Sequence, residues 1–148
     1  MREAARKGQE NLFTGSREEA AQELAGCNVG DGDYARKHCF LEAVIMSCAA
    51  VIGYAGRYAA LARQEAVSCT DRARKEELLQ IASNCERVPA KGARSFHEAC
   101  QSFWFIQQLL QMESSGHSIS PGRFDQYMYP FYQKDMEAGK ITRDEAQE

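Results

Sequence analysis

The residues best suited to chemistry lie in one segment, residues 113–132, with the sequence ESSGHSISPGRFDQYMYPFY. His117 follows a glycine and precedes Ser118, so an imidazole and a hydroxyl group that can each donate or accept a hydrogen bond stand side by side. Phe124 supplies an apolar wall, and glycine backbone can approach a ligand closely. The segment predicts either a ligand-binding loop or a tight turn whose serines cap the next helix, and the residues alone favour neither.

The other patterns that could carry chemistry are weaker. His97 and Cys100 lie three residues apart on one helical face, but two ligands are not a metal site, and a partly buried helix histidine is the simpler interpretation. His38 and Cys39 are adjacent and point apart on a helix. There is no Gly-x-Ser-x-Gly motif and no glycine-rich phosphate loop. We therefore predict neither a metal site nor a nucleophile triad.

The composition is that of a globular protein. The chain has 148 residues, of which 44% are hydrophobic and 26% charged, with a net charge of -3. Its densest basic run, residues 72–77, is mixed with acids, so no nucleic acid binding is expected. The longest apolar run, residues 43–52, is shorter than the ~20 residues that cross a bilayer, and residues 1–10 have no apolar core of a signal peptide. We expect a cytoplasmic protein that does not bind a membrane.

Six cysteines are many for a chain of this size, and they stand at positions 27, 39, 48, 69, 85 and 100. None forms a Cys-x-x-Cys pair, so the zinc and thioredoxin signatures are absent. Because no export signal is visible, we expect reduced thiols that are buried as structural residues, and not three disulfides.

The spacing of apolar residues predicts a mainly α-helical chain. A short helix is expected over residues 17–26, with Ser16 as its cap, and the longest helix over residues 34–68. Apolar positions in the long helix keep a three-then-four spacing for about six turns. Gly53 and Gly56 interrupt it, each at a cost of up to ~1 kcal/mol. Small residues at that spacing suggest that another element crosses closely there.

The second half of the chain has clear start and stop signals. A helix over residues 71–86 must end before Pro89. A Ser-x-x-Glu capping box opens a helix over residues 95–114, and Gly116 ends it. Four large apolar residues in a row leave this helix without a polar face, so we expect it to be enclosed on most sides.

The last predicted helix covers residues 125–139, with Pro130 bending it or marking its start and Gly139 closing it. Thr142 and Glu145 then form a second capping box, and the sequence stops three residues later. Single helical turns are unstable by themselves. We therefore expect the chain to be an internal part of a longer polypeptide.

Three stretches, MESSGHSISPGRFDQYMYPFY, ACQSFWFIQ and AVIGYAGRYAALA, together resemble the pyruvate formate-lyase-like domain of glycyl radical enzymes. The similarity extends from about Tyr34 to the last residue. We accordingly expect a poorly diagnostic N-terminal helical segment, residues 1–33, and a part of that domain, residues 34–148. The resemblance implies a mainly α chain that is one helical segment of an α/β barrel enzyme, whose full-length form has a ten-stranded barrel ringed by helices.

The resemblance also implies a radical mechanism. Family members carry a radical on a backbone glycine, installed by a radical S-adenosylmethionine activating enzyme, and pass it to a cysteine that abstracts hydrogen from a small-molecule substrate. Gly-His-Ser followed by Gly-Arg-Phe-Asp-Gln is most similar to the branch that cleaves C–O or C–N bonds, which includes glycerol and diol dehydratases and choline lyase. Many of its members are labelled formate C-acetyltransferase. By the family pattern, His117 and Ser118 hydrogen-bond a substrate hydroxyl, Phe124 shapes the pocket, and the full-length enzyme is a homodimer.

This sequence departs from the family pattern at both radical-bearing positions. The family's Gly-Cys motif lies downstream of Gly-His-Ser, whereas Gly26-Cys27 lies upstream, and the Arg-Val-x-Gly-Tyr loop is absent. We therefore expect no catalytic residue in this chain, no bound cofactor and no activity by the chain alone. Two alternatives remain: a small helical binding module that uses the aromatic face around Trp104 and Tyr127, and a complete small enzyme that uses His117.

Overall fold

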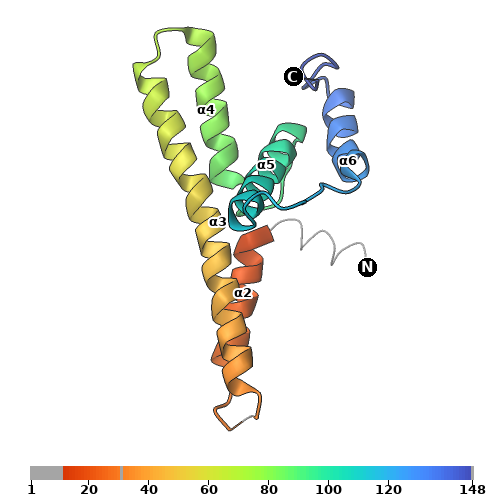
Figure 1. Ribbon diagram of the computed structural model, residues 1–148. Helices are drawn as coiled ribbons and strands as arrows, with labels where there is room; N and C mark the ends of the chain where they lie inside the picture. The colour runs from red at the N-terminus through yellow and green to blue at the C-terminus, as the bar shows by residue number, and fades with distance from the viewer. Residues whose placement is uncertain (1–11, 31, 148) are drawn as a thin grey trace.

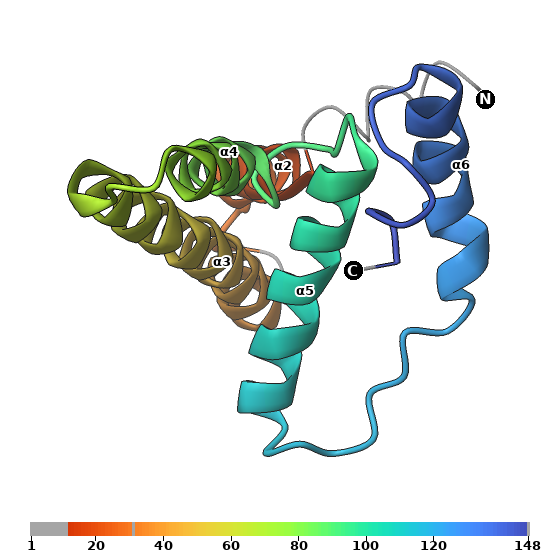
Figure 2. The ribbon, with the colours of Figure 1, turned by 90° about the horizontal axis from the view of Figure 1, so that it is seen from above.

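The computed structural model describes residues 12–30 and 32–147, which contain α-helices joined by turns and no strand. The helices are α2 (Leu12–Ala25), α3 (Tyr34–Ser68), α4 (Arg72–Arg87), α5 (Phe96–Glu113) and α6 (Phe124–Glu137). α3 is the long axis of the molecule: α2 lies along its first half, α4 along its second half, and α5 crosses near its middle (Figure 1). α6 lies beyond α5 (Figure 2). The prediction of a mainly α chain is confirmed, while residues 1–11, on which the signal-peptide argument rests, lie outside the described residues.

α3 spans Tyr34–Ser68, as the apolar spacing predicts. Its buried side chains form one stripe of mostly small residues: Leu41, Cys48, Ala55, Ala59, Ala62 and Ala66. Apart from the backbone of α3 itself, no atom of the described residues lies within 4 Å of a Cβ built on Gly53 or Gly56, so the prediction that an element crosses at these glycines is wrong for this part of the chain. With 3.6 residues per turn, Gly56 and Gly53 lie roughly 100° and 160° around the helix from Ala55, and the crossing helix packs on the alanine side.

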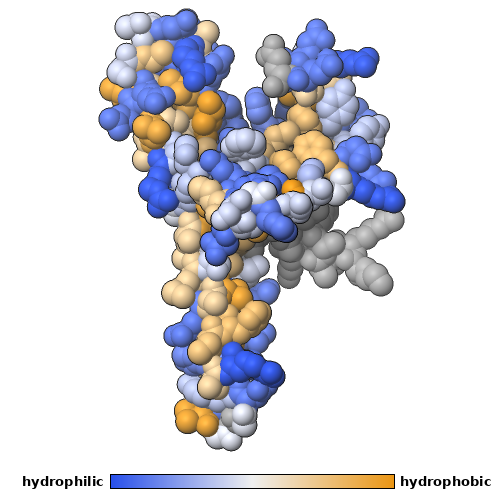
Figure 3. Space-filling view, in the orientation of Figure 1, coloured by the Kyte–Doolittle hydropathy of each residue, from blue (hydrophilic) through white to orange (hydrophobic). Residues whose placement is uncertain are grey.

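α3 is also the one helix within residues 12–30 and 32–147 that is long and apolar enough to cross a membrane, judged by its length and composition. The longest uninterrupted apolar run, residues 43–52, is too short to reveal this feature. The helices α2 and α4 bury one stripe of α3, but only 17% of its most apolar 18-residue window is buried within the described residues. The space-filling view shows that apolar surface continues over the lower half of α3 (Figure 3).

α2 begins earlier than the sequence predicts. The expected helix starts at residue 17 with Ser16 as its cap, but α2 covers Leu12–Ala25, so Ser16 lies inside it. The first N–H groups of a helix have no partner within the helix. Here the backbone N–H of Thr14 donates to the carbonyl of Ala90, at 3.1 Å. A contact with a distant segment therefore replaces the cap that the local sequence suggested.

α4 has the limits that its sequence signals predict. The carboxylate of Asp71 caps the helix and accepts hydrogen bonds from the N–H groups of Ala73 and Arg74, at 2.8 and 3.3 Å. The helix ends at Arg87, and a cis peptide bond joins Val88 to Pro89. Both ends thus follow from residues within or next to the helix.

α5 starts at the predicted capping box, with one difference. The hydroxyl of Ser95 accepts from the N–H of Glu98, at 3.1 Å. The carboxylate of Glu98 accepts from the N–H of Arg94, at 2.6 Å, and not from Ser95. It also lies 3.3 Å from Arg87 Nε in an ion pair whose side chains are both 16% exposed. The start of α5 is therefore fixed to the end of α4.

The described residues cover α5 less than the sequence suggests. Phe105 is 2% exposed and packs against Ala55, Ala59 and Cys85, where α5 crosses α3 and α4. Trp104, its neighbour, is 59% exposed. Among the described residues, α3 and α4 cover one flank of α5 and α6 covers another, so this part of the chain does not by itself supply the enclosure predicted for α5.

All six cysteines are free thiols, as expected, but their burial varies. Cys48 and Cys85 are buried and Cys39 is exposed, so the prediction of buried thiols is wrong for the set as a whole. Burial, and to a smaller extent the charge of Glu86, raises the pKa of the Cys85 thiol. Burial also raises the pKa of the Cys100 thiol. These two thiols are protonated and unreactive at neutral pH.

α6 begins at Phe124, so Pro130 lies inside the helix and does not mark its start. Proline has no N–H, so the backbone carbonyl one turn earlier does not accept the hydrogen bond that it would otherwise accept within the helix. Gly139 adopts a positive φ of 65° and ends the helix as predicted, and the N–H of Lys140 returns to the carbonyl of Asp135, at 2.9 Å. Beyond it the second capping box forms in both directions: Thr142 N–H donates to the Glu145 carboxylate, at 2.8 Å, and Glu145 N–H to the Thr142 hydroxyl, at 3.2 Å.

Candidate functional site

The candidate site is the loop of residues 114–123, which joins α5 to α6 (Figure 2). α5 ends with a hydrogen bond from the N–H of Gly116 to the carbonyl of Gln111, at 2.8 Å. Gly116 was predicted to end the helix, but Ser115 already has a positive φ, of 55°, and Gly116 follows with 80°. A left-handed conformation costs a residue other than glycine roughly 1–2 kcal/mol. This strain lies two residues before His117.

His117 and Ser118 are both exposed. Among residues 12–30 and 32–147, no group hydrogen-bonds either side chain, and the N–H of His117 donates to the carbonyl of Ser114, at 3.2 Å. The alternative interpretation, in which the serines of this segment cap α6, is wrong, because the cap position holds Arg123 and has no side-chain hydrogen bond. An imidazole and a hydroxyl are thus adjacent and available to a ligand.

Contacts to both helices hold the loop. They are a hydrogen bond from Gln107 Nε2 to the carbonyl of Ile119 at 2.8 Å, one from the Tyr127 hydroxyl to the carbonyl of Pro121 at 2.9 Å, and an edge-to-face pair of the Phe103 and Phe124 rings at 4.9 Å. Phe124 also meets the Tyr127 ring, at 5.7 Å between centroids. Phe124 is therefore half-buried in an aromatic cluster that fixes the start of α6.

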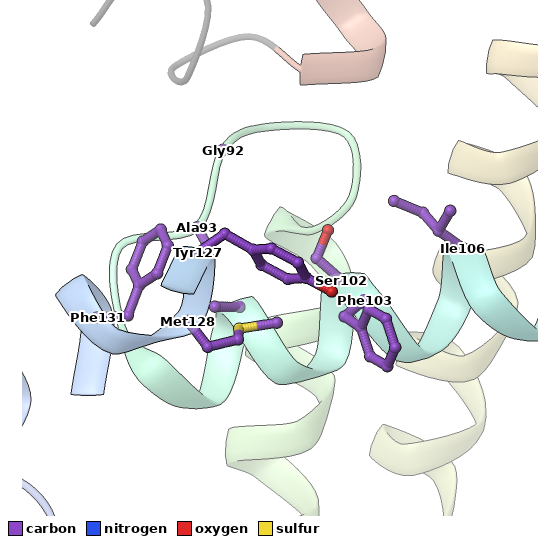
Figure 4. Close-up of a pocket in the computed structure, with 9 residues that line it drawn as sticks. Gly92, Ala93, Ser102, Phe103, Ile106, Tyr127, Met128 and Phe131 are labelled. Atoms are coloured by element: carbon purple, nitrogen blue, oxygen red, sulfur yellow. The ribbon is translucent and has the colours of Figure 1, made fainter. Parts of the chain in front are cut away.

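A cavity of about 300 Å³ lies between α5, α6 and the segment that precedes α5 (Figure 4). Its lining is almost entirely apolar and consists of Gly92, Ala93, Ala99, Ser102, Phe103, Ile106, Tyr127, Met128 and Phe131. His117, Ser118 and Phe124 do not line it, so the predicted site residues and the cavity are neighbours and not one pocket. No sequence motif marks the cavity, because most of its lining residues are ordinary apolar residues of α5 and α6.

The end of the α5–α6 pair opposite the loop is held by a buried carboxylate. Asp135 is 1% exposed, and its Oδ2 accepts from the N–H of Phe96, at 2.7 Å, in the first turn of α5. A carboxylate is favourable there because it faces the positive end of the helix dipole. The ammonium group of Lys134 donates to the carbonyl of Arg94, at 2.9 Å. The α5–α6 pair is thus a helical hairpin. Asp135 and Lys134 hold one end of it together, and the loop lies at the other end.

The other candidates are placed apart from this loop. The turn between α2 and α3, which contains Gly26-Cys27, is at the lower tip of the molecule in Figure 1, well away from the loop that joins α5 to α6. Cys27 is half-buried there, and its thiol donates to the carbonyl of Glu23, at 3.4 Å. No group of three or more His, Cys, Asp or Glu side chains placed to hold a metal ion occurs within residues 12–30 and 32–147.

Comparison with known proteins identifies the family. All residues from 1 to 148 match the sequence model of the family described as pyruvate formate lyase-like. The chain belongs to the pyruvate formate lyase-like family. Among curated proteins, the isethionate sulfite-lyase of Desulfovibrio desulfuricans is 46% identical over 92% of this chain and 17% of its own length. The chain therefore spans about a sixth of the length of this relative.

Solved structures of pyruvate formate lyase-like proteins share the helical arrangement. The structure that describes 1,2-propanediol dehydration in Roseburia inulinivorans has 56% sequence identity and a TM-score of 0.87, over 95% of this chain and 17% of that one. A glycyl radical enzyme from Archaeoglobus fulgidus has 37% identity and a TM-score of 0.86, over 93% of this chain and 18% of that one. The resemblance to glycyl radical enzymes, and the place of this chain as a helical part of their fold, are confirmed.

Proposed function

We propose that this chain is one part of a glycyl radical enzyme that eliminates water from a small vicinal diol, and that it supplies one wall of the substrate pocket. The 56% identity to the Roseburia inulinivorans protein of 1,2-propanediol dehydration, at a TM-score of 0.87, is the observation that supports it. In this proposal the radical-bearing cysteine and glycine belong to sequence outside these 148 residues, and the chain alone is inactive.

His117 and Ser118 bind and orient the substrate hydroxyl groups in this proposal. Both side chains are exposed and without a hydrogen-bond partner among the described residues, so neither must break an existing bond to bind substrate. A hydrogen bond gains strength when the surrounding site excludes water. Phe124, braced by the Phe103 ring at 4.9 Å, gives the apolar side of the pocket a fixed position.

The glycyl radical, installed by a radical S-adenosylmethionine activating enzyme, supplies hydrogen-atom abstraction through a cysteine. The residues of this chain contribute binding and orientation to that reaction. The full-length protein, in this proposal, is a cytoplasmic homodimer whose partners are the activating enzyme and a small-molecule substrate.

An assay of the full-length protein tests the proposal. After anaerobic activation, with the radical measured by electron paramagnetic resonance, propane-1,2-diol is expected to give propanal. His117→Ala and Ser118→Ala are each expected to lower kcat/KM by about 10- to 100-fold, since a lost or unpaired hydrogen bond costs about 1–3 kcal/mol. His97→Ala, an exposed histidine on α5, is the matched control. A full radical signal without propanal contradicts the proposal.

C–S bond cleavage is the second candidate, and the 46% identity to isethionate sulfite-lyase favours it. Isethionate is therefore assayed in parallel, with sulfite as the product, and choline and pyruvate test the C–N lyase and formate C-acetyltransferase alternatives. The chain of 148 residues alone is expected to turn over none of these compounds. Turnover by it would refute the assignment of the catalytic residues to sequence elsewhere.

A further inference from the structure

We propose that Gln107 is a positioning residue for the His117–Ser118 pair, an inference that rests on the proposed function of that pair. Gln107 lies on α5, and its side chain is partly buried. Its amide nitrogen Nε2 donates to the carbonyl oxygen of Ile119, at 2.8 Å, across 12 residues of sequence. Ile119 directly follows Ser118, so this bond acts on the backbone that carries both polar side chains.

The hydrogen bond from Gln107 matters because the loop has few others. Between residues 118 and 122, within the described chain, no backbone group pairs with another backbone group. The two hydrogen bonds that this stretch makes come from helix side chains, Gln107 at the carbonyl of Ile119 and Tyr127 at the carbonyl of Pro121. A loop without backbone pairing has many conformations of similar energy. The two side chains therefore select among these conformations.

Gln107 has the more direct effect of these two side chains. Its acceptor, Ile119, is one residue from Ser118, whereas the acceptor of Tyr127 is three residues away. Gln107 also lies one turn after Phe103, whose ring meets Phe124 at 4.9 Å. One face of α5 thus sets the direction of the imidazole, the hydroxyl and the aromatic wall together.

Gln107 can be replaced by side chains that differ in whether they donate a hydrogen bond. Such variants distinguish a positioning role from a purely structural one. Gln107→Leu removes the donor and keeps the approximate size. In Gln107→Glu the ionised carboxylate can only accept, so it repels the carbonyl of Ile119, while the protonated carboxyl can donate to it again. The effect of the glutamate must therefore reverse as the pH falls through the pKa of the new carboxyl.

The experiment uses the full-length, activated protein with propane-1,2-diol as substrate. Gln107→Leu is expected to lower kcat/KM about 10-fold at unchanged radical content, and to speed amide hydrogen exchange at Gly116 and His117, whose N–H groups are hydrogen-bonded, but not in α3. Gln107→Glu is expected to be slower than Gln107→Leu at pH 8 and to recover relative to it as the pH is lowered through the range in which the new carboxyl takes up a proton. Gln108→Leu and Gln108→Glu are the matched controls, because the half-buried Gln108 makes no side-chain hydrogen bond among the described residues.

The outcomes separate this inference from the proposed function. Equal kcat/KM and equal exchange in the Gln107 and Gln108 variants refute the role of Gln107, as does a Gln107→Glu variant without the pH-dependent recovery. If His117→Ala loses activity while Gln107→Leu does not, the substrate site stands and only the positioning role falls. If His117→Ala also keeps full activity, the proposed site is wrong and the role of Gln107 falls with it.

Discussion

Two regions of the molecule are stabilised by different kinds of contact. The first, which we call the frame, consists of the helices α2, α3 and α4, and the second is the α5–α6 hairpin with its loop. The first region packs through small side chains, mainly the alanine stripe of α3. Alanine loses no rotamer freedom on burial and lets helices lie close together. The hairpin packs through aromatic rings and is tied by side-chain hydrogen bonds at both ends. The frame is thus stabilised by regular helix packing, whereas the hairpin, which carries the candidate site, depends on a few individual side chains.

The two regions meet at a small number of residues. Phe105 packs where α5 meets α3 and α4, and its ring forms an edge-to-face pair with Tyr54 at 5.7 Å between centroids. Arg87, the last residue of α4, pairs with Glu98 and donates from Nη2 to the carbonyl of Gly92, at 2.9 Å. Changes at these contacts should therefore weaken the packing of the hairpin against α3 and α4.

The largest effect is expected from Phe105→Ala. Removing a phenylalanine that is 2% exposed leaves a cavity at the junction and should cost about 3–5 kcal/mol, measured by urea unfolding of the 148-residue chain. Trp104→Ala, which changes the 59% exposed neighbour on the same helix, should change the stability by under about 0.5 kcal/mol. Equal losses in the two variants would contradict the division of the molecule into two regions joined at Phe105.

An intermediate effect is expected from Asp135→Ala, which acts inside the hairpin. The variant leaves the N–H of Phe96 unpaired at the start of α5 and should cost about 1–3 kcal/mol. Asp135→Asn keeps an acceptor oxygen and should lose less. Amide hydrogen exchange should rise in the first turn of α5 and stay unchanged in α4, while Asp144→Ala, an exposed aspartate, is the control. Faster exchange in α4 would show that the hairpin and the frame are not independent.

The smallest effect is local to the turn after α6. Hydrogen bonds from the backbone and then the side chain of Thr142 lower the pKa of Glu145 below its ordinary value. The stabilising effect of this carboxylate is therefore present above its ordinary pKa and is lost as the pH falls through the lowered pKa. Thr142→Ala should raise the pKa of Glu145 part of the way back, because the backbone bond remains, as followed by NMR titration. An unchanged pKa would show that the capping box does not form in solution.

Several elements could be predicted from the sequence because their signals are local. The limits of α3 follow from its apolar spacing, and those of α4 from Asp71 and Pro89. The start of α5 follows from its capping box. The loop after α5 was identified as a candidate site from its residue types. The chain's membership of a larger enzyme family was predicted from this segment together with two stretches upstream of it. The role of the loop in substrate binding stays a prediction.

Predictions from local sequence patterns were wrong where the contacts of a residue are decided by a distant segment. Ser16 has the type of a helix cap, yet α2 begins before it because Ala90 accepts from the first turn. Gly53 and Gly56 have the spacing of a close crossing, yet they point away from the helices that α3 contacts. The hydrophobic run of α5 indicates burial without saying which side chain meets which helix.

Residue order alone accounts for the limits of α3 and α4 and for the start of α5, because caps, proline and glycine act on backbone groups within a few residues of themselves. It does not account for the pairing of Gln107 with Ile119 or of Asp135 with Phe96, since those contacts depend on how α5 and α6 cross. The crossing is the result of side-chain packing summed over both helices. For this reason the chemistry of His117 and Ser118 is visible in the sequence, whereas the groups that direct them are visible only in the folded chain.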